Sequence, residues 1–132
     1  MANTNINLSY NIVATDIAAN VNVFTRNISG FQLAATLWAA SDFFQVPTTL
    51  TSISLPATTI YFVYVRNLGA NNVTLSYTPT GGSSTSLVLL PTGSNIGGIF
   101  LYGLSAETAG GITAMSLQAS TATTPVEYFL GA

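Results

Sequence analysis

The feature that most constrains this chain is the regular return of turn residues. Stretches rich in β-branched and aromatic residues end at Gly, Pro, Asn or Ser about every eight to twelve residues. The clearest stretch, residues 59–67 (TIYFVYVRN), is almost wholly β-branched or aromatic, which is typical of a central strand covered on both faces. This spacing predicts an all-β fold, an antiparallel β-sandwich of jelly-roll type with eight or nine short strands.

The same reasoning places the remaining strands and loops. Further strands are expected at residues 5–15, 21–28, 51–55, 72–78, 85–90, 95–102, 111–119 and 126–130. Residues 31–40 (FQLAATLWAA) fit a strand or a short helix, and their alternation and strand neighbours favour a strand.

Turn residues set the expected connections. Residues 16–20 read as a turn or as one helical turn, Ser29-Gly30 as the end of a strand, and residues 41–51 as a long loop. The stretches 59–67 and 72–78 resemble the two strands of a hairpin joined by a four-residue loop. The alternation within residues 111–119 predicts Ile112, Ala114 or Met115, and Leu117 as core residues.

Length and composition indicate one domain spanning residues 1–132. The chain is 132 residues long and contains no obvious linker or low-complexity segment. Hydrophobic residues make up 48% of it, but polar residues interrupt every apolar stretch before it could span a membrane as a helix. The first residues lack the basic and apolar regions of a secretion signal, so we expect no export and no membrane partner.

Charged residues are scarce, and this excludes several classes of function. Two arginines and four carboxylates give a net charge of −2, and the chain contains no Lys, His or Cys. A histidine base, a cysteine nucleophile, a lysine Schiff base and a zinc site of His or Cys are therefore excluded. Two arginines also cannot form the basic surface of a nucleic-acid-binding protein.

The four carboxylates belong to Asp16, Asp42, Glu107 and Glu127, which lie far apart in the sequence. They form neither a recognisable catalytic pair nor an Asp-x-Asp cluster for calcium. We therefore expect a non-enzymatic protein with no cofactor and no metal. A surface of Thr, Ser, Asn, Ala and Gly with so little charge favours association with other subunits, and we expect a homo-oligomer.

Four residues are candidates for an interface. Arg66 ends the most apolar strand, where it must reach solvent, stack on Tyr64 or Tyr77, or pair with a carboxylate such as Glu127. Trp38, Phe43 and Phe44 lie in a stretch without clear periodicity. They either close the open end of the sandwich or anchor a contact with a neighbouring chain, and Trp38 could also stack on a sugar.

The C-terminal half resembles a known group of proteins. Residues 65–75 (VRNLGANNVTL), residues 87–93 (LVLLPTG) and residues 126–131 (VEYFLG) match an RN-x-G-x-N-x-V-x-L hairpin, an L-x-L-x-P-x-G strand end and a VEY-led C-terminus. These patterns are similar to those of small β-sandwich virion proteins of tailed bacteriophages. The resemblance implies a structural role on the particle, often as a trimer, and it supplies no catalytic residue.

Together these observations predict a virion structural protein that is assembled in the host cytoplasm. The expected role is a head decoration, cement or minor capsid protein that contacts the major capsid protein through apolar surface. A tail protein, or a receptor-binding or carbohydrate-binding module, is the alternative.

Overall fold

The computed structural model describes residues 4–35, 39–93, 98–103 and 110–132. All regular secondary structure in these residues is β, which confirms the all-β prediction. The ten strands are β1 (Thr4–Asp16), β2 (Val21–Ala35), β3 (Ala39–Val46), β4 (Thr51–Ser52), β5 (Phe62–Asn67), β6 (Val73–Pro79), β7 (Thr85–Leu89), β8 (Ile99–Tyr102), β9 (Ile112–Ala119) and β10 (Thr124–Gly131).

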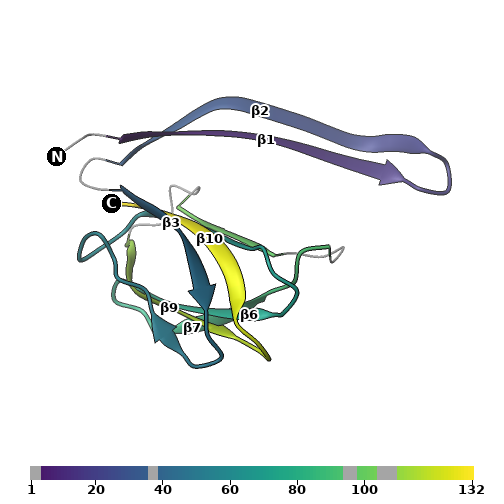
Figure 1. The fold of residues 1–132 in the computed structure, drawn as a ribbon. Helices are drawn as coiled ribbons and strands as arrows, with labels where there is room; N and C mark the ends of the chain where they lie inside the picture. Colours follow the sequence, from purple (N-terminus) through teal and green to yellow (C-terminus); the bar gives the residue numbers. More distant parts are fainter. Residues whose placement is uncertain (1–3, 36–38, 94–97, 104–109) are drawn as a thin grey trace.

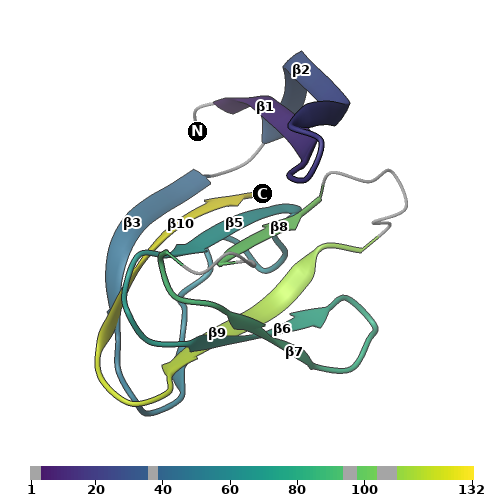
Figure 2. The same cartoon turned by 90° about the vertical axis from the view of Figure 1, so that its right-hand side faces the viewer.

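Eight of these strands form two four-stranded antiparallel sheets. The first sheet has the order β3-β10-β5-β8 and the second the order β4-β9-β6-β7. The two sheets face each other in a sandwich-like arrangement, as Figure 2 shows. The pairings are nested along the chain: β6 pairs with β7, β5 with β8, β4 with β9 and β3 with β10.

One hydrophobic core fills the space between the two sheets. Its fully buried members include Val46, Ile60, Val63, Val65, Val73, Leu75, Leu89, Val126 and Leu130. Ile112, Met115 and Leu117 are also buried, as the sequence predicts, whereas Ala114 is exposed. Two inward residues lie three apart on β9 because the register with β6 shifts between Thr78 and Pro79.

The predicted central strand lies at the expected position, but it is not covered on both faces. β5 lies between β10 and β8, and Val63 and Val65 are fully buried. Tyr64 is only half-buried and Arg66 is exposed, so just one face of this part of the strand is fully covered. The apolar run therefore does not mark a strand covered on both faces.

The predicted hairpin between residues 59–67 and 72–78 is wrong. β5 belongs to the first sheet and β6 to the second, so the residues between them cross from one sheet to the other. The loop expected at residues 41–51 is also wrong in its first half, because β3 pairs along its whole length with β10. Both errors arise because the strand partners are distant in sequence.

The N-terminal strands form a separate hairpin, residues 4–35, which we call the arm. Among the described residues, β1 and β2 pair only with each other, and the arm lies outside the two sheets with its turn extending beyond them (Figure 1). In the predicted turn, Oδ1 of Asp16 accepts hydrogen bonds from the backbone N–H groups of Ala18 and Ala19 at 2.9 and 3.1 Å. Ser29-Gly30 does not end β2, because these residues form a bulge where the register shifts opposite Leu8 and Tyr10.

Candidate functional site

The outward surface of the first sheet carries charged and apolar side chains in two rows. We call this surface the outer face. The first row crosses the four strands as Phe43, Glu127, Arg66 and Ile99, each directly opposite the next. The second row contains Phe129, Tyr64 and Leu101 on β10, β5 and β8. Phe43, Ile99 and Leu101 are exposed, so apolar side chains stand on both sides of the central charges.

The centre of the outer face is a small polar cluster. The Tyr64 hydroxyl donates a hydrogen bond of 2.7 Å to Oε1 of Glu127, and the same oxygen lies 3.8 Å from Nη1 of Arg66. Burial raises the pKa of the Tyr64 phenol, and the Glu127 carboxylate raises it further while Arg66 opposes that effect. Arg66 therefore takes one of its predicted roles, pairing with Glu127, while 47% of its side chain stays exposed.

A depression of about 260 Å³ adjoins this cluster, and we call it the aromatic pocket. It is lined by Asp42, Phe43, Tyr64, Glu127, Tyr128 and Phe129. Burial raises the pKa of the Tyr128 phenol, and the nearby Asp42 carboxylate adds to that increase. The Asp42 carboxylate is exposed, and Oδ1 accepts a hydrogen bond of 2.7 Å from the N–H of Phe43. The rings of Phe43, Tyr64 and Phe129 and the Glu127 carboxylate stand on the outer face at this pocket. Asp42 and Tyr128 are opposite each other one residue along the same two strands, so their side chains point to the other face of the sheet.

The predicted interface residues have different surroundings. Phe43 is 69% exposed and stands at the rim of the aromatic pocket. Phe44 points the other way, is half-buried and packs against the core, which accounts for its apolar side chain without any partner. Trp38 lies outside the described residues. Sequence reasoning missed Tyr64 and Tyr128 as residues that line the pocket. Tyr64 is opposite Phe129, and Tyr128 is opposite Asp42, only because strands distant in sequence pair with each other.

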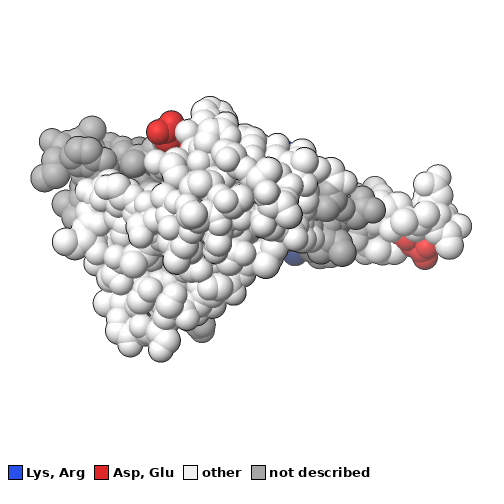
Figure 3. All heavy atoms as spheres, turned by 60° about the horizontal axis from the view of Figure 1, so that its bottom comes forward, with Lys and Arg blue, Asp and Glu red and all other residues white. Residues whose placement is uncertain are grey.

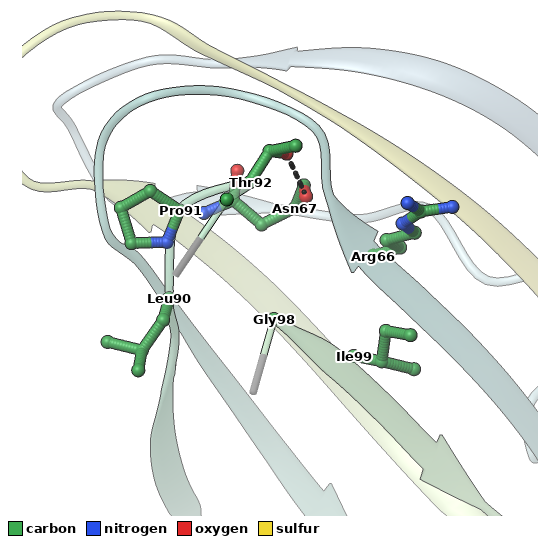
Figure 4. A pocket seen from close by; sticks show the side chains of 8 residues that line it. Arg66, Asn67, Leu90, Pro91, Thr92, Gly98 and Ile99 are labelled. Atoms are coloured by element: carbon green, nitrogen blue, oxygen red, sulfur yellow. Dashed lines mark hydrogen bonds between the residues drawn. The ribbon is translucent and has the colours of Figure 1, made fainter. Parts of the chain in front are cut away.

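A second depression, of about 180 Å³, lies where β5 ends and is lined in part by Arg66, Asn67 and Thr92 (Figure 4). Asn67 is buried, and its side chain is used fully by the fold. Its Nδ2 donates to the carbonyl oxygens of Asn71 and Leu89, and its Oδ1 accepts from the N–H of Gly69. Its backbone oxygen accepts a bond of 3.0 Å from Oγ1 of Thr92. The polar side chain at this depression, Asn67, is therefore explained by its role in holding the fold together.

The outward surface of the second sheet has a different character. One row across its four strands consists of Ser52, Ser116, Ser76 and Ser86, in direct register. The hydroxyls of Ser76 and Ser86 are 2.7 Å apart. Figure 3 turns the lower side of Figure 1 forward, and nearly all the described atoms on that side belong to uncharged residues. Among the described charged residues of the sandwich, Arg66 and Glu127 lie on the outer face instead.

Within the described part of the chain, no three His, Cys, Asp or Glu residues come together as a group that could hold a metal ion. The same residues include no helix long and apolar enough to cross a membrane. No protein-family model matches the chain, and a search of curated proteins finds no match.

Proposed function

We propose that this chain is a jelly-roll virion structural protein of a tailed phage, acting without catalysis as a head decoration, cement or minor capsid protein. It would join copies of itself and contact other virion proteins, such as the major capsid protein, through apolar surface.

The nested strand pairing supports the jelly-roll topology. A jelly roll results when one long antiparallel hairpin is rolled up, so its first strand pairs with its last and its two middle strands pair with each other. The pairs β3–β10, β4–β9, β5–β8 and β6–β7 follow this rule. A jelly roll also has eight strands in two sheets, as this sandwich does, and the architecture is common among viral capsid proteins.

The observation that carries the structural role is the exposed arm. Every residue from 11 to 27 is exposed, and these residues include Ile12, Ile17, Val23 and Phe24. Ile17 at the turn is 93% exposed. Apolar side chains and free strand edges of this kind favour contact with a neighbouring protein. Since the chain has almost no charge, such contacts are dominated by burial of apolar surface.

The test is quantitative mass spectrometry of purified particles of the phage whose genome encodes the chain. The proposal expects the chain in the particles at a copy number that matches positions of the capsid lattice. A copy number of a few per particle would instead assign the chain to the tail. Its absence from purified, infectious particles would overturn the proposal.

A carbohydrate-binding or receptor-binding module is the second candidate, and the aromatic pocket favours it. Aromatic rings with a few polar groups in a concave site are typical of small-ligand sites. A glycan array probed with the intact protein tests this function, with Phe43→Ala as the variant expected to lose binding. Absence of binding to any glycan by the folded wild-type protein would exclude the carbohydrate-binding function.

A further inference from the structure

The aromatic pocket presents an open ring beside a ring that is held in place. Phe43 on β3 is largely exposed, so a ligand can reach its ring. Phe129 on β10 meets the buried Phe62 edge-on, with the ring centroids 5.9 Å apart and 63° between the ring planes. This contact fixes Phe129 as one side of the pocket, while Phe43 offers a surface on which a flat ligand can pack.

Two hydrogen-bond acceptors stand beside the Phe43 ring. Glu127 is directly opposite Phe43, and its Oε1 accepts the hydrogen bond of 2.7 Å from the Tyr64 hydroxyl. Among the described residues, no donor reaches Oε2 of Glu127, and 28% of this side chain is exposed. The Tyr64 hydroxyl gives its proton to Glu127, so its oxygen can still accept a hydrogen bond. The pocket therefore offers two neighbouring acceptors to a ligand that carries hydroxyl groups.

The charge of Glu127 is balanced within the sheet. Nη1 of Arg66 lies 3.8 Å from Oε1 of Glu127, so one positive and one negative side chain stand side by side. A cation that approached Glu127 would be repelled by Arg66, and an anion would be repelled by Glu127 itself. A neutral ligand meets neither repulsion. The charge balance therefore favours an uncharged ligand at this pocket.

The size of the pocket limits the ligand to about one ring. Its volume of about 260 Å³ is below the roughly 300–1,000 Å³ of pockets that enclose a drug-sized molecule. A pyranose ring is uncharged, has a face of C–H groups that packs on an aromatic ring, and carries adjacent hydroxyl donors at its edge. These three properties match the charge balance, the exposed ring and the paired acceptors of the pocket.

We infer that the aromatic pocket is a subsite for one neutral pyranose ring. The C–H face of the sugar packs on Phe43, and two neighbouring hydroxyls donate hydrogen bonds to Oε2 of Glu127 and to the Tyr64 oxygen. Arg66 keeps the site neutral as a whole. The inference rests on the carbohydrate-binding candidate of the proposed function, and it names the ligand class and the residues that select it.

The first test titrates the full-length protein with three neutral sugars and one cation, and NMR chemical shifts give each Kd. The sugars are the methyl pyranosides of β-glucose, β-galactose and α-mannose, and the cation is tetramethylammonium. At least one sugar should bind at millimolar concentration, and tetramethylammonium should bind at least about tenfold more weakly than that sugar. Absence of binding by all three sugars, or tighter binding of the cation, would overturn the inference.

Variants of Phe43 test the packing of the sugar on the ring. Phe43→Ala should weaken binding of the sugar by at least about tenfold, whereas Phe43→Tyr keeps the ring and should stay within about threefold of the wild type. Tyr61→Ala is the matched control, because Tyr61 is also an exposed aromatic residue but does not line the pocket. The control should bind as the wild type does. Unchanged binding by Phe43→Ala would place the sugar elsewhere and overturn the inference.

A second variant tests the acceptor role of Glu127. Glu127→Gln keeps the shape of the side chain but makes the hydrogen bond to the sugar one between neutral groups, so binding should weaken by at least about threefold. Asp16→Asn removes the same charge at the exposed turn of the arm and should leave sugar binding unchanged. Circular dichroism melts confirm that each variant is folded before it is titrated. If the two variants weaken binding equally, the effect comes from net charge, and the role given to Glu127 is wrong.

Failure of this inference can be told apart from failure of either proposed function. If the glycan array finds a ligand whose binding ignores changes at Phe43 and Glu127, the carbohydrate-binding function stands and the subsite is wrong. If the sugars and variants behave as expected but the chain is absent from particles, the subsite stands and the virion role fails.

Discussion

The Tyr64 hydroxyl donates a hydrogen bond of 2.7 Å to the Glu127 carboxylate, across two neighbouring strands and 63 residues of sequence. The bond places a neutral phenol between β5 and β10 at the centre of the outer face. It also holds the carboxylate that faces Arg66. The protonation state of the Tyr64 phenol should therefore affect the stability of the sheet.

We expect the protein to lose stability as the pH rises above about 10, the ordinary pKa of a tyrosine. The pKa of Tyr64 is raised in the folded state, so the folded protein holds its proton more tightly than the unfolded chain does. The resulting stabilisation is complete below the unfolded pKa and is lost as the pH rises through the higher folded value. Thermal melts from pH 8 to 11 measure this loss, and Tyr64→Phe should show a shallower decline. An identical decline in that variant would contradict the role given to Tyr64.

Val63→Asp should abolish folding. Val63 is fully buried on β5, and an unpaired carboxylate there has no partner in the core. The control is Val88→Asp, because Val88 on β7 is 53% exposed, and it should change the free energy of unfolding by no more than about 0.5 kcal/mol. Circular dichroism melts compare the two, and a cooperatively melting Val63→Asp protein would show that the position of β5 is wrong.

Asn67→Ala should lower the free energy of unfolding by about 1–3 kcal/mol, since the carbonyl oxygens of Asn71 and Leu89 lose their donor. Asn72→Ala, at an exposed position in the same connection, should stay close to the wild type. Urea denaturation of both variants gives the comparison. Equal stability of the two would remove the structural explanation of Asn67.

Attachment to the particle should depend little on salt. The whole chain carries six charged side chains, and few surface charges leave little for ions to screen. Washing particles in up to about 0.5 M NaCl should leave the chain bound, because at that concentration screening acts mainly on exposed charges. Release by salt alone, without denaturant, would point to an ionic contact and against the apolar one proposed.

Local features of the sequence account for what could be predicted. The β-branched stretches gave the strand class of β5, β6, β9 and β10, and Asp16 with Asn20 marked the turn of the arm, where Asn20 has a φ of +52°. The bulge at Ser29-Gly30 was read as a strand end. A bulge and a strand end use the same residue types, and they differ only in whether pairing with the partner strand continues beyond them. The aromatic pocket could not be predicted, since Phe43 and Glu127 meet only through the pairing of β3 with β10.

The sequence by itself determined that the chain is all-β, because strand propensity is a property of short stretches. It also determined that histidine, cysteine and lysine chemistry is missing, because composition is a property of the whole chain. The tertiary structure decided which strands pair, which face each aromatic residue occupies and where the few charges meet. Phe43 and Phe44 illustrate the difference, since one is exposed at the pocket and its neighbour packs against the core. Alternation dictates that adjacent residues of a strand point to opposite faces, but only the packing of one sheet on the other decides which face is covered.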